Sequence, residues 1–209
     1  MDKKAEKEYW AGFYLSRELN HPSPFAEFCQ EKFLKKNEKI IDLGCGTGRD
    51  SLFFFNKGHQ IIGVDQSGAI ISELQRLHND KHESLKFIET DFTNQTDDEK
   101  FGVVYSRLSL HSIDSVSASR TLKWIYRNIN DGGKFLLEAR SVKDDLYGKG
   151  KQVERDAFVT THYRRFLRLD ELLVELKDIG FKIKYSIEQK GLARFKDEDP
   201  IVIRICAEK

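Results

Sequence analysis

A glycine-rich loop that directly follows an apolar strand constrains the fold of this chain more than any other feature. Residues 39–43 have the composition of a buried strand, and Gly-Cys-Gly-Thr-Gly at 44–48 leads into a helical segment. Glycines allow a sharp turn there and let a ligand approach the backbone N–H groups at the start of the helix. A dinucleotide fingerprint would have its third glycine at position 49, which is Arg49, so the spacing argues against NAD and FAD.

Short apolar strands alternate with helical segments along most of the chain. Strands are predicted at 39–43, 60–65, 85–88, 101–105 and 134–139. Helices are predicted at about 5–19, from Pro24 after the N-cap Ser23, at 52–55, at about 68–79, at about 122–129 and at 170–179. Two last strands, 181–187 and 200–207, could pair as an antiparallel hairpin at one edge. The alternation predicts an α/β fold with a Rossmann-like, doubly wound sheet of seven mostly parallel strands.

An acid stands just before the glycine loop, and the whole segment resembles motif I of the class I S-adenosylmethionine-dependent methyltransferases. That motif reads D/E-x-G-x-G-x-G and matches here at Asp42, Gly44, Gly46 and Gly48. The resemblance implies that the loop wraps the methionine end of the cofactor and that the acid helps to hold its ammonium group. The same residues could instead form a glycine-rich turn that binds nothing.

Two further acids end the second and third predicted strands. Asp65, within Gly-Val-Asp-Gln-Ser at 63–67, can accept hydrogen bonds from the two hydroxyls of a ribose. The resemblance implies that Asp91 holds the adenine amino group and that Phe92 covers the ring. Either acid alone could be an ordinary turn or cap residue, but three signals in this order over residues 38–140 predict S-adenosylmethionine as the cofactor. The predicted cofactor site also takes in neighbouring residues and two N-terminal aromatic residues: Trp10, Tyr14, Cys45, Asp50, Gln66 and Ser106.

Catalytic and acceptor-binding candidates follow the fourth and fifth strands. His111 is a candidate general base or a capping histidine, and His162 is the second candidate base. The polar loop at 141–162 lacks a clear pattern, and loops of that length usually serve function or are disordered. Arginine forks suit phosphate or carboxylate. The predicted acceptor-binding residues are Arg107, Arg140, Tyr147, Lys149, Tyr163, Arg164 and Arg165.

Three segments, at 22–28, 139–150 and 162–166, are similar to small methyltransferases of bacterial capsule and surface-polysaccharide gene clusters. This resemblance implies O-methylation of a small anionic acceptor, such as a phosphate-bearing sugar or a sugar nucleotide. Alternatives are an N-methyltransferase for a small amine and a non-catalytic, cofactor-binding partner subunit. An RNA methyltransferase would need a basic face or an added domain.

The composition of the chain limits its possible binding partners and its cellular location. The chain has 35 Lys and Arg against 34 Asp and Glu, a formal net charge of +1, which argues against a nucleic-acid partner. Cys29, Cys45 and Cys206 lack ligand spacing, so neither a metal site nor a disulfide is expected. The charged N-terminus and the short apolar runs predict a cytoplasmic protein with no membrane partner, as a monomer or homodimer. We expect one domain over 1–209, made of an N-terminal helical cap (1–37), a cofactor-binding core (38–140), and a substrate loop with C-terminal strands (141–209).

Overall fold

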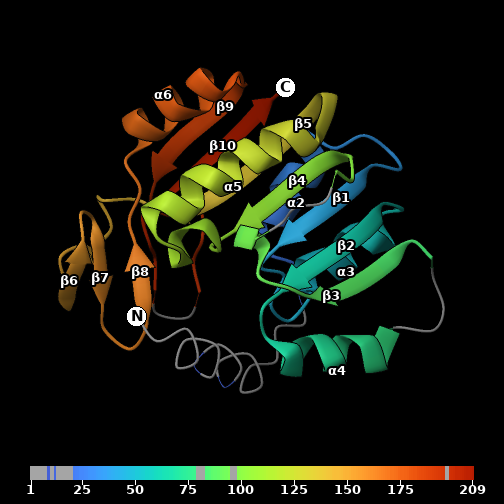
Figure 1. The fold of residues 1–209 in the computed structure, drawn as a ribbon, viewed down its shortest axis with the longest axis horizontal. Helices are drawn as coiled ribbons and strands as arrows, with labels where there is room; N and C mark the ends of the chain where they lie inside the picture. Colours follow the sequence, from blue (N-terminus) through green and yellow to red (C-terminus); the bar gives the residue numbers. More distant parts are fainter. Residues whose placement is uncertain (1–8, 10–11, 13–20, 79–82, 95–97, 196–197) are drawn as a thin grey trace.

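The computed structural model describes residues 9, 12, 21–78, 83–94, 98–195 and 198–209, and is built on one seven-stranded sheet (Figure 1). The strands lie in the order β3-β2-β1-β4-β5-β10-β9. Their bounds are β1 Lys39–Leu43, β2 Gln60–Asp65, β3 Leu85–Glu89, β4 Phe101–Arg107, β5 Ile129–Arg140, β9 Lys182–Gln189 and β10 Val202–Glu208. The first five are parallel, and β10 runs antiparallel to both β5 and β9. The predicted fold class is confirmed.

Helices cover both faces of this sheet. They are α2 Pro24–Lys32, α3 Arg49–Asn56, α4 Gly68–His78, α5 Ser115–Asn128 and α6 Leu169–Ile179. One buried apolar cluster joins the sheet to α5 and α6, and a second joins it to α2, α3 and α4. Side chains of β1 alternate between them, with Ile41 in the first cluster and Ile40 in the second. In Figure 1, α5 and α6 lie in front of the sheet, and α2 and α3 lie behind it.

The start of α2 shows how local sequence sets a helix boundary. The Ser23 side chain accepts a hydrogen bond from the Ala26 N–H, and Pro24 occupies the first helical position, as predicted. The helix predicted over 5–19, with Trp10 and Tyr14, lies outside the described residues except for Tyr9 and Gly12.

The polar segment predicted as a loop at 141–162 contains regular structure, so that prediction is wrong. It contributes two strands, β6 Lys151–Glu154 and β7 Ala157–Val159, to a separate three-stranded antiparallel sheet. The third strand, β8 Tyr163–Arg165, follows directly after the segment and pairs with β7. The rings of Tyr147, Phe158 and Phe166 pack together edge to face against this sheet. Strands of three or four residues are too short to show an alternating pattern in the sequence.

One boundary also differs from prediction at the junction of α5 and β5. The strand expected over 134–139 begins at Ile129, directly after α5 ends at Asn128. The pairing of β4 with β5 shifts register there, because Phe101 faces Ile129 whereas Val103 faces Lys134. Gly132 and Gly133, which lie within β5 between these two pairings, therefore belong to an irregularity of the strand. Among the residues that the structure describes, none of the helices has the length and apolar character needed to cross a membrane.

Candidate functional site

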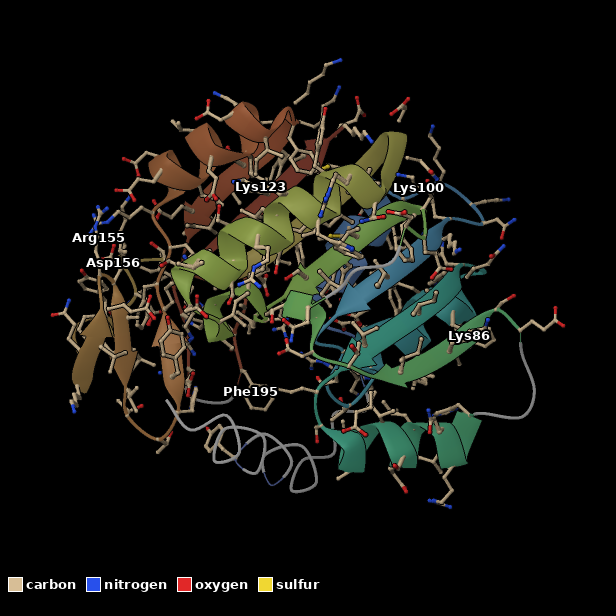
Figure 2. The ribbon with its side chains drawn as sticks, viewed as in Figure 1. Lys86, Lys100, Lys123, Arg155, Asp156 and Phe195 are labelled. Carbon is tan, nitrogen blue, oxygen red and sulfur yellow. The ribbon has the colours of Figure 1, made fainter. Side chains whose placement is uncertain are left out.

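Two adjoining cavities open where the parallel strands end. The larger, about 350 Å³, is bounded by the glycine loop on one side and by β8 and the β9–β10 connection on the other. The smaller, about 60 Å³, lies against the ends of β2 and β3. Gly44 and Leu108 line both cavities, so together they form one elongated site. Figure 2 shows Phe195, which lines the larger cavity, projecting into the space between β8 and the large sheet.

The glycine loop has a backbone that only glycine adopts readily. Gly44, Gly46 and Gly48 have φ values of 76°, 52° and 72°, in the left-handed region. A Cβ at Gly44 would lie 2.7 Å from the Ser109 Cβ, and one at Gly48 would lie 2.9 Å from a methyl carbon of Leu74. Gly48 does not line either cavity, so the structure gives it a packing role, unlike Gly44 and Gly46.

The three acids predicted at the strand ends all line the elongated site. Asp42 is buried and accepts a hydrogen bond from the Ser51 hydroxyl at 2.6 Å; burial raises the pKa of its carboxyl to about 7. Asp65 accepts from the N–H groups of Gly46 at 3.0 Å and Ser67 at 2.9 Å, which ties the glycine loop to the end of β2. Burial raises the pKa of Asp65, and those N–H groups oppose the rise.

At the smaller cavity, Asp91 directly precedes the short helix η1 Phe92–Asn94, and its carboxylate accepts from the Thr93 N–H at 2.9 Å. Phe92 and Gln66 line the same cavity. The Ser112 hydroxyl also lies there, buried and without a hydrogen-bond partner among the described residues. A buried hydroxyl left without a partner costs stability, so this cavity offers a polar ligand a donor or acceptor.

Asp50 and Ser106 have structural roles at this edge of the sheet. Asp50 accepts from the N–H and the hydroxyl of Ser23, both at 2.7 Å, and from the Tyr105 hydroxyl at 2.8 Å. These bonds fix the entry to α2 against the start of α3. Ser106 is fully buried, bonds the Ser109 hydroxyl at 2.7 Å, and lines neither cavity. Cys45 lines the larger cavity as a small buried residue, and burial raises its pKa.

Both candidate bases line the larger cavity. His111 is carried by the short helix η2 Leu110–Ser112, and its Nδ1 accepts from the Arg140 N–H in a long contact of 3.4 Å. Burial, and then the nearby arginines, lower its pKa well below the usual value. A neutral ring with Nδ1 as acceptor carries its proton on Nε2, so His111 offers a donor there.

His162 has partners on both ring nitrogens. Its Nε2 lies 2.8 Å from the Arg164 Nη2, and its Nδ1 lies 3.0 Å from the Thr161 hydroxyl. Burial, followed by Arg164 and Arg140, lowers the pKa of His162 to about 4. The imidazole is therefore neutral near pH 7.

The predicted acceptor-binding arginines differ in how fully they are paired. Arg140 donates to both oxygens of Asp144 at 3.2 Å and to Glu198 at 2.6 Å. Arg165 donates to the backbone carbonyls of Ile113 and Leu110 and does not line the larger cavity.

Arg107 and Arg164 both line the larger cavity. The Arg107 Nε lies 2.9 Å from a Glu138 oxygen as an ion pair. Arg164 has a buried Nε without a hydrogen-bond partner among the described residues.

Three other predicted acceptor-binding residues do not line either cavity. The Tyr147 hydroxyl donates to Asp156 at 2.6 Å, and the Tyr163 hydroxyl donates to Glu154 at 3.2 Å, both within or beside the small sheet. Lys149 is exposed in the turn before β6. Their sequence position suggested a substrate loop, whereas the structure uses them to build or flank the small sheet.

The structure adds residues that the sequence analysis missed. Arg49 lines the larger cavity, and its position directly after the glycine loop is a sequence signal that could have identified it. Tyr9 stacks on His162 with ring centroids 4.5 Å apart, and Phe195 and Glu198 come from the β9–β10 connection. No motif marks these three residues, because only the folded chain brings their segments to the cavity.

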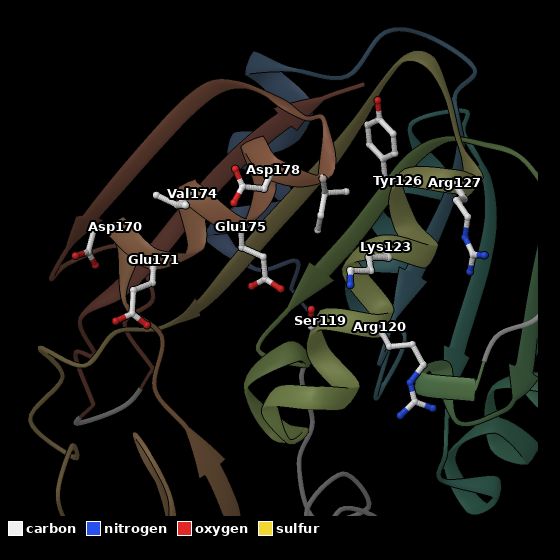
Figure 3. Close-up of a pocket in the computed structure, with 11 residues that line it drawn as sticks. Ser119, Arg120, Lys123, Tyr126, Arg127, Asp170, Glu171, Val174, Glu175 and Asp178 are labelled. Carbon is white, nitrogen blue, oxygen red and sulfur yellow. The ribbon is translucent and has the colours of Figure 1, made fainter.

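A larger hollow, about 910 Å³, lies between α5 and α6 (Figure 3). Basic side chains of α5 and acidic side chains of α6 stand on either side of it, among them Lys123 and Glu175. None of the motif residues lines this groove. The elongated site at the strand ends is the one that the sequence motifs share.

A seven-stranded sheet in this order, with cavity-lining acids at or just beyond the ends of β1, β2 and β3, defines the class as a Rossmann-like class I methyltransferase fold. Residues 15–186 match the family model described as a methyltransferase domain, and the chain belongs to that family. A solved S-adenosylmethionine-dependent methyltransferase from Methanosarcina mazei superposes with a TM-score of 0.74 at 21% identity, covering 86% of this chain and 96% of that one.

Two further comparisons bear on cofactor and activity. A glycopeptide N-methyltransferase complexed with S-adenosyl-L-homocysteine has a TM-score of 0.68 at 16% identity, covering 91% of each chain. The eEF1A lysine and N-terminal methyltransferase of Mus musculus is 24% identical over 136 residues, which are 62% of this chain and 20% of that protein. The chain thus spans about a fifth of that curated relative. Family and fold together support S-adenosylmethionine as the cofactor.

Proposed function

We propose that this chain transfers a methyl group from S-adenosylmethionine to an oxygen of a small anionic acceptor. The elongated site carries this proposal, because acids line its glycine-loop end and arginines gather in its larger cavity. A phosphate-bearing sugar or sugar nucleotide of surface-polysaccharide assembly is the acceptor class we favour, on the resemblance described above. A cytoplasmic setting and a single domain over 1–209 belong to the same proposal.

The residues present fit the cofactor along the length of the site. Asp42 and the N–H groups of the glycine loop would hold the methionine end, with the carboxylate facing the ammonium. Asp65 would accept from the ribose hydroxyls. Asp91, Phe92 and the unpartnered Ser112 hydroxyl would take the adenine end. When bound, the cofactor supplies a methyl group already activated on a sulfonium.

The protein's own contribution is mainly to position the acceptor and to receive its proton. Holding a nucleophile in line with a reactive carbon can lower a barrier by about 7–11 kcal/mol in the best cases. The larger cavity contains His111 and His162 for hydrogen bonding or proton transfer. The aromatic side chains of Tyr9 and Phe195 form an apolar part of the wall of the larger cavity.

The charge of the larger cavity favours an anionic acceptor over an amine. Three carboxylates line it, those of Asp42, Asp50 and Glu198, and each already accepts a hydrogen bond from the protein. Five arginines line it: Arg49, Arg107, Arg140, Arg164 and Arg194. Four of these arginines pair with carboxylates, so among the described residues Arg164 is the lining arginine without an ion pair. Its guanidinium is available to an anionic group, whereas a cationic amine would find no spare carboxylate, so N-methylation of a small amine is the weaker alternative.

Calorimetry with S-adenosylhomocysteine, with NAD as the control ligand, tests the cofactor part of the proposal. We expect micromolar binding of the first and none of the second. Phosphorylated and nucleotide-linked sugars should then accept tritiated methyl groups, and their neutral parent sugars should not. Binding without transfer to any of these acceptors would favour a non-catalytic partner subunit or another substrate class.

The affinity for S-adenosylhomocysteine should rise with pH up to about 7 and then level off. Burial places the Asp42 pKa at about 7, so below that pH the carboxyl is protonated and must release a proton to face an ammonium. The affinity for S-adenosylhomocysteine should therefore be at its full value above pH 7 and fall by up to about tenfold per pH unit below pH 7. Calorimetry from pH 5.5 to 8.5 in two buffers of different ionisation enthalpy measures the proton released. Asp42→Asn should bind weakly at every pH, and a pH profile unchanged by this substitution would contradict the role of Asp42.

A further inference from the structure

The contact between His162 and Arg164 occupies the basic atom of the imidazole. Arginine has only donors, so the 2.8 Å contact from Nη2 makes His162 Nε2 the acceptor. The ring proton is then on Nδ1, which donates to the Thr161 hydroxyl at 3.0 Å. In this arrangement the lone pair that would accept a proton from an acceptor hydroxyl is already in use.

Arg164 has an unused donor beside this contact. Its Nε is buried and has no hydrogen-bond partner among the described residues, although the side chain lines the cavity. No carboxylate in the described part of the chain forms a salt bridge with it, whereas Arg140 has two. A phosphate or carboxylate can bind Nε and a terminal nitrogen together as a fork, which is the strongest pairing an arginine makes.

The imidazole is held in place independently of Arg164. Tyr9 stacks on it with an interplanar angle of 24°, and Thr161 holds its Nδ1. The titratable and charged groups that face it come from five parts of the chain: Tyr9, His111, Arg140, Arg164 and Glu198. Movement of Arg164 would therefore expose Nε2 while the ring keeps its orientation.

We propose that Arg164 masks the base His162 until the anionic group of the acceptor binds the guanidinium and draws it from Nε2. The inference rests on the proposed function and names how that site selects its substrate. A neutral acceptor leaves Arg164 on the imidazole and meets no base. An anionic acceptor pairs with Arg164 and finds the Nε2 lone pair available.

The proton transfer that follows is balanced. The acceptor O–H gives its proton to His162 Nε2 while its oxygen forms the bond to the methyl carbon. The electron pair of the broken carbon–sulfur bond stays on sulfur and cancels the sulfonium charge. The imidazolium formed is stabilised by the bound anion and by Glu198, which already raises the pKa of His162. His111 is less suited, because its Nε2 carries a proton when Nδ1 accepts from Arg140.

Titration of the histidines followed by nuclear magnetic resonance tests whether Arg164 blocks His162 Nε2, and it requires no methyl transfer. The chain has six histidines, and His162→Gln assigns the signal. In chloride, wild-type His162 should titrate near its depressed pKa of about 4. At equal ionic strength, inorganic phosphate should move that pKa upward, toward the ordinary value of about 6.5.

Arg164→Gln should raise the His162 pKa in chloride and abolish the further response to phosphate. Arg155→Gln is the matched control, since Arg155 is exposed in the turn between β6 and β7 of the same small sheet and pairs with Glu171. His162 in this variant should titrate as it does in the wild type. An unchanged His162 pKa in Arg164→Gln, or an equal phosphate response in that variant, would overturn the proposal. S-adenosylhomocysteine calorimetry on the same samples distinguishes failure of this inference from failure of the proposed function. If the protein binds S-adenosylhomocysteine but the His162 pKa does not respond to phosphate, only the role of Arg164 is contradicted. If S-adenosylhomocysteine does not bind, the proposed function is contradicted.

Discussion

Asp65→Asn should weaken S-adenosylhomocysteine binding by at least about 100-fold, because hydrogen bonds to a charged group are worth about 1.5–3 kcal/mol each. The carboxylate lines the smaller cavity at the end of β2, where it would accept from two ribose hydroxyls. It also accepts from the N–H of Gly46, so it places the glycine loop against the ligand. The asparagine amide has one acceptor oxygen in place of two and no charge.

The control for this variant is Asp98→Asn, which makes the same change at an exposed acid that lines neither cavity. Both variants should remain folded by circular dichroism, and only Asp65→Asn should lose ligand binding in calorimetry. A folded Asp65→Asn protein that binds S-adenosylhomocysteine as tightly as the wild type would remove Asp65 from the cofactor site.

Regular periodicity made the large sheet predictable. The bounds expected for β1 and β2 match the observed strands residue for residue, because each is a short apolar run between turn residues. In a parallel sheet the strand ends meet at one edge, so the order Asp42, Asp65 and Asp91 was enough to predict that they share a site. The local cap at Ser23 was predictable for the same reason, since its partner lies three residues away.

Pairing between distant residues was not predictable in this way. Sequence position put Arg140 and Tyr147 in a substrate site. Arg140 does line the larger cavity, but there it pairs with Glu198, 58 residues away, whereas Tyr147 lines neither cavity and bonds Asp156. A charge is visible in the sequence, but its partner is set by the fold. The identity of the base depends on such partners too, because hydrogen bonds decide which nitrogen of each histidine carries the proton.

The role of Glu138 in stability depends on contacts that form only in the folded chain. Its side chain is fully buried at the end of β5, with one oxygen 2.9 Å from the Arg107 Nε and the other 2.7 Å from the Arg204 Nε. Arg204 also lies over the rings of Phe25 and Phe28, at 5.1 and 5.4 Å from their centroids. One carboxylate therefore balances two guanidinium groups and joins β4, β5 and β10 beneath the site.

Glu138→Gln should lower the free energy of unfolding by about 3–5 kcal/mol, since removing one partner leaves buried charge without compensation. For a domain of this size that corresponds to a fall in melting temperature of roughly 10 °C, measured by calorimetry or circular dichroism. Glu99→Gln makes the same chemical change in an exposed pair with Lys39, also 2.7 Å long, and should cost less than about 1 kcal/mol. Equal, small losses in both variants would contradict the argument. They would mean that the two arginines find other partners or water when the carboxylate is removed, and that burial of Glu138 contributes little to the stability of the sheet.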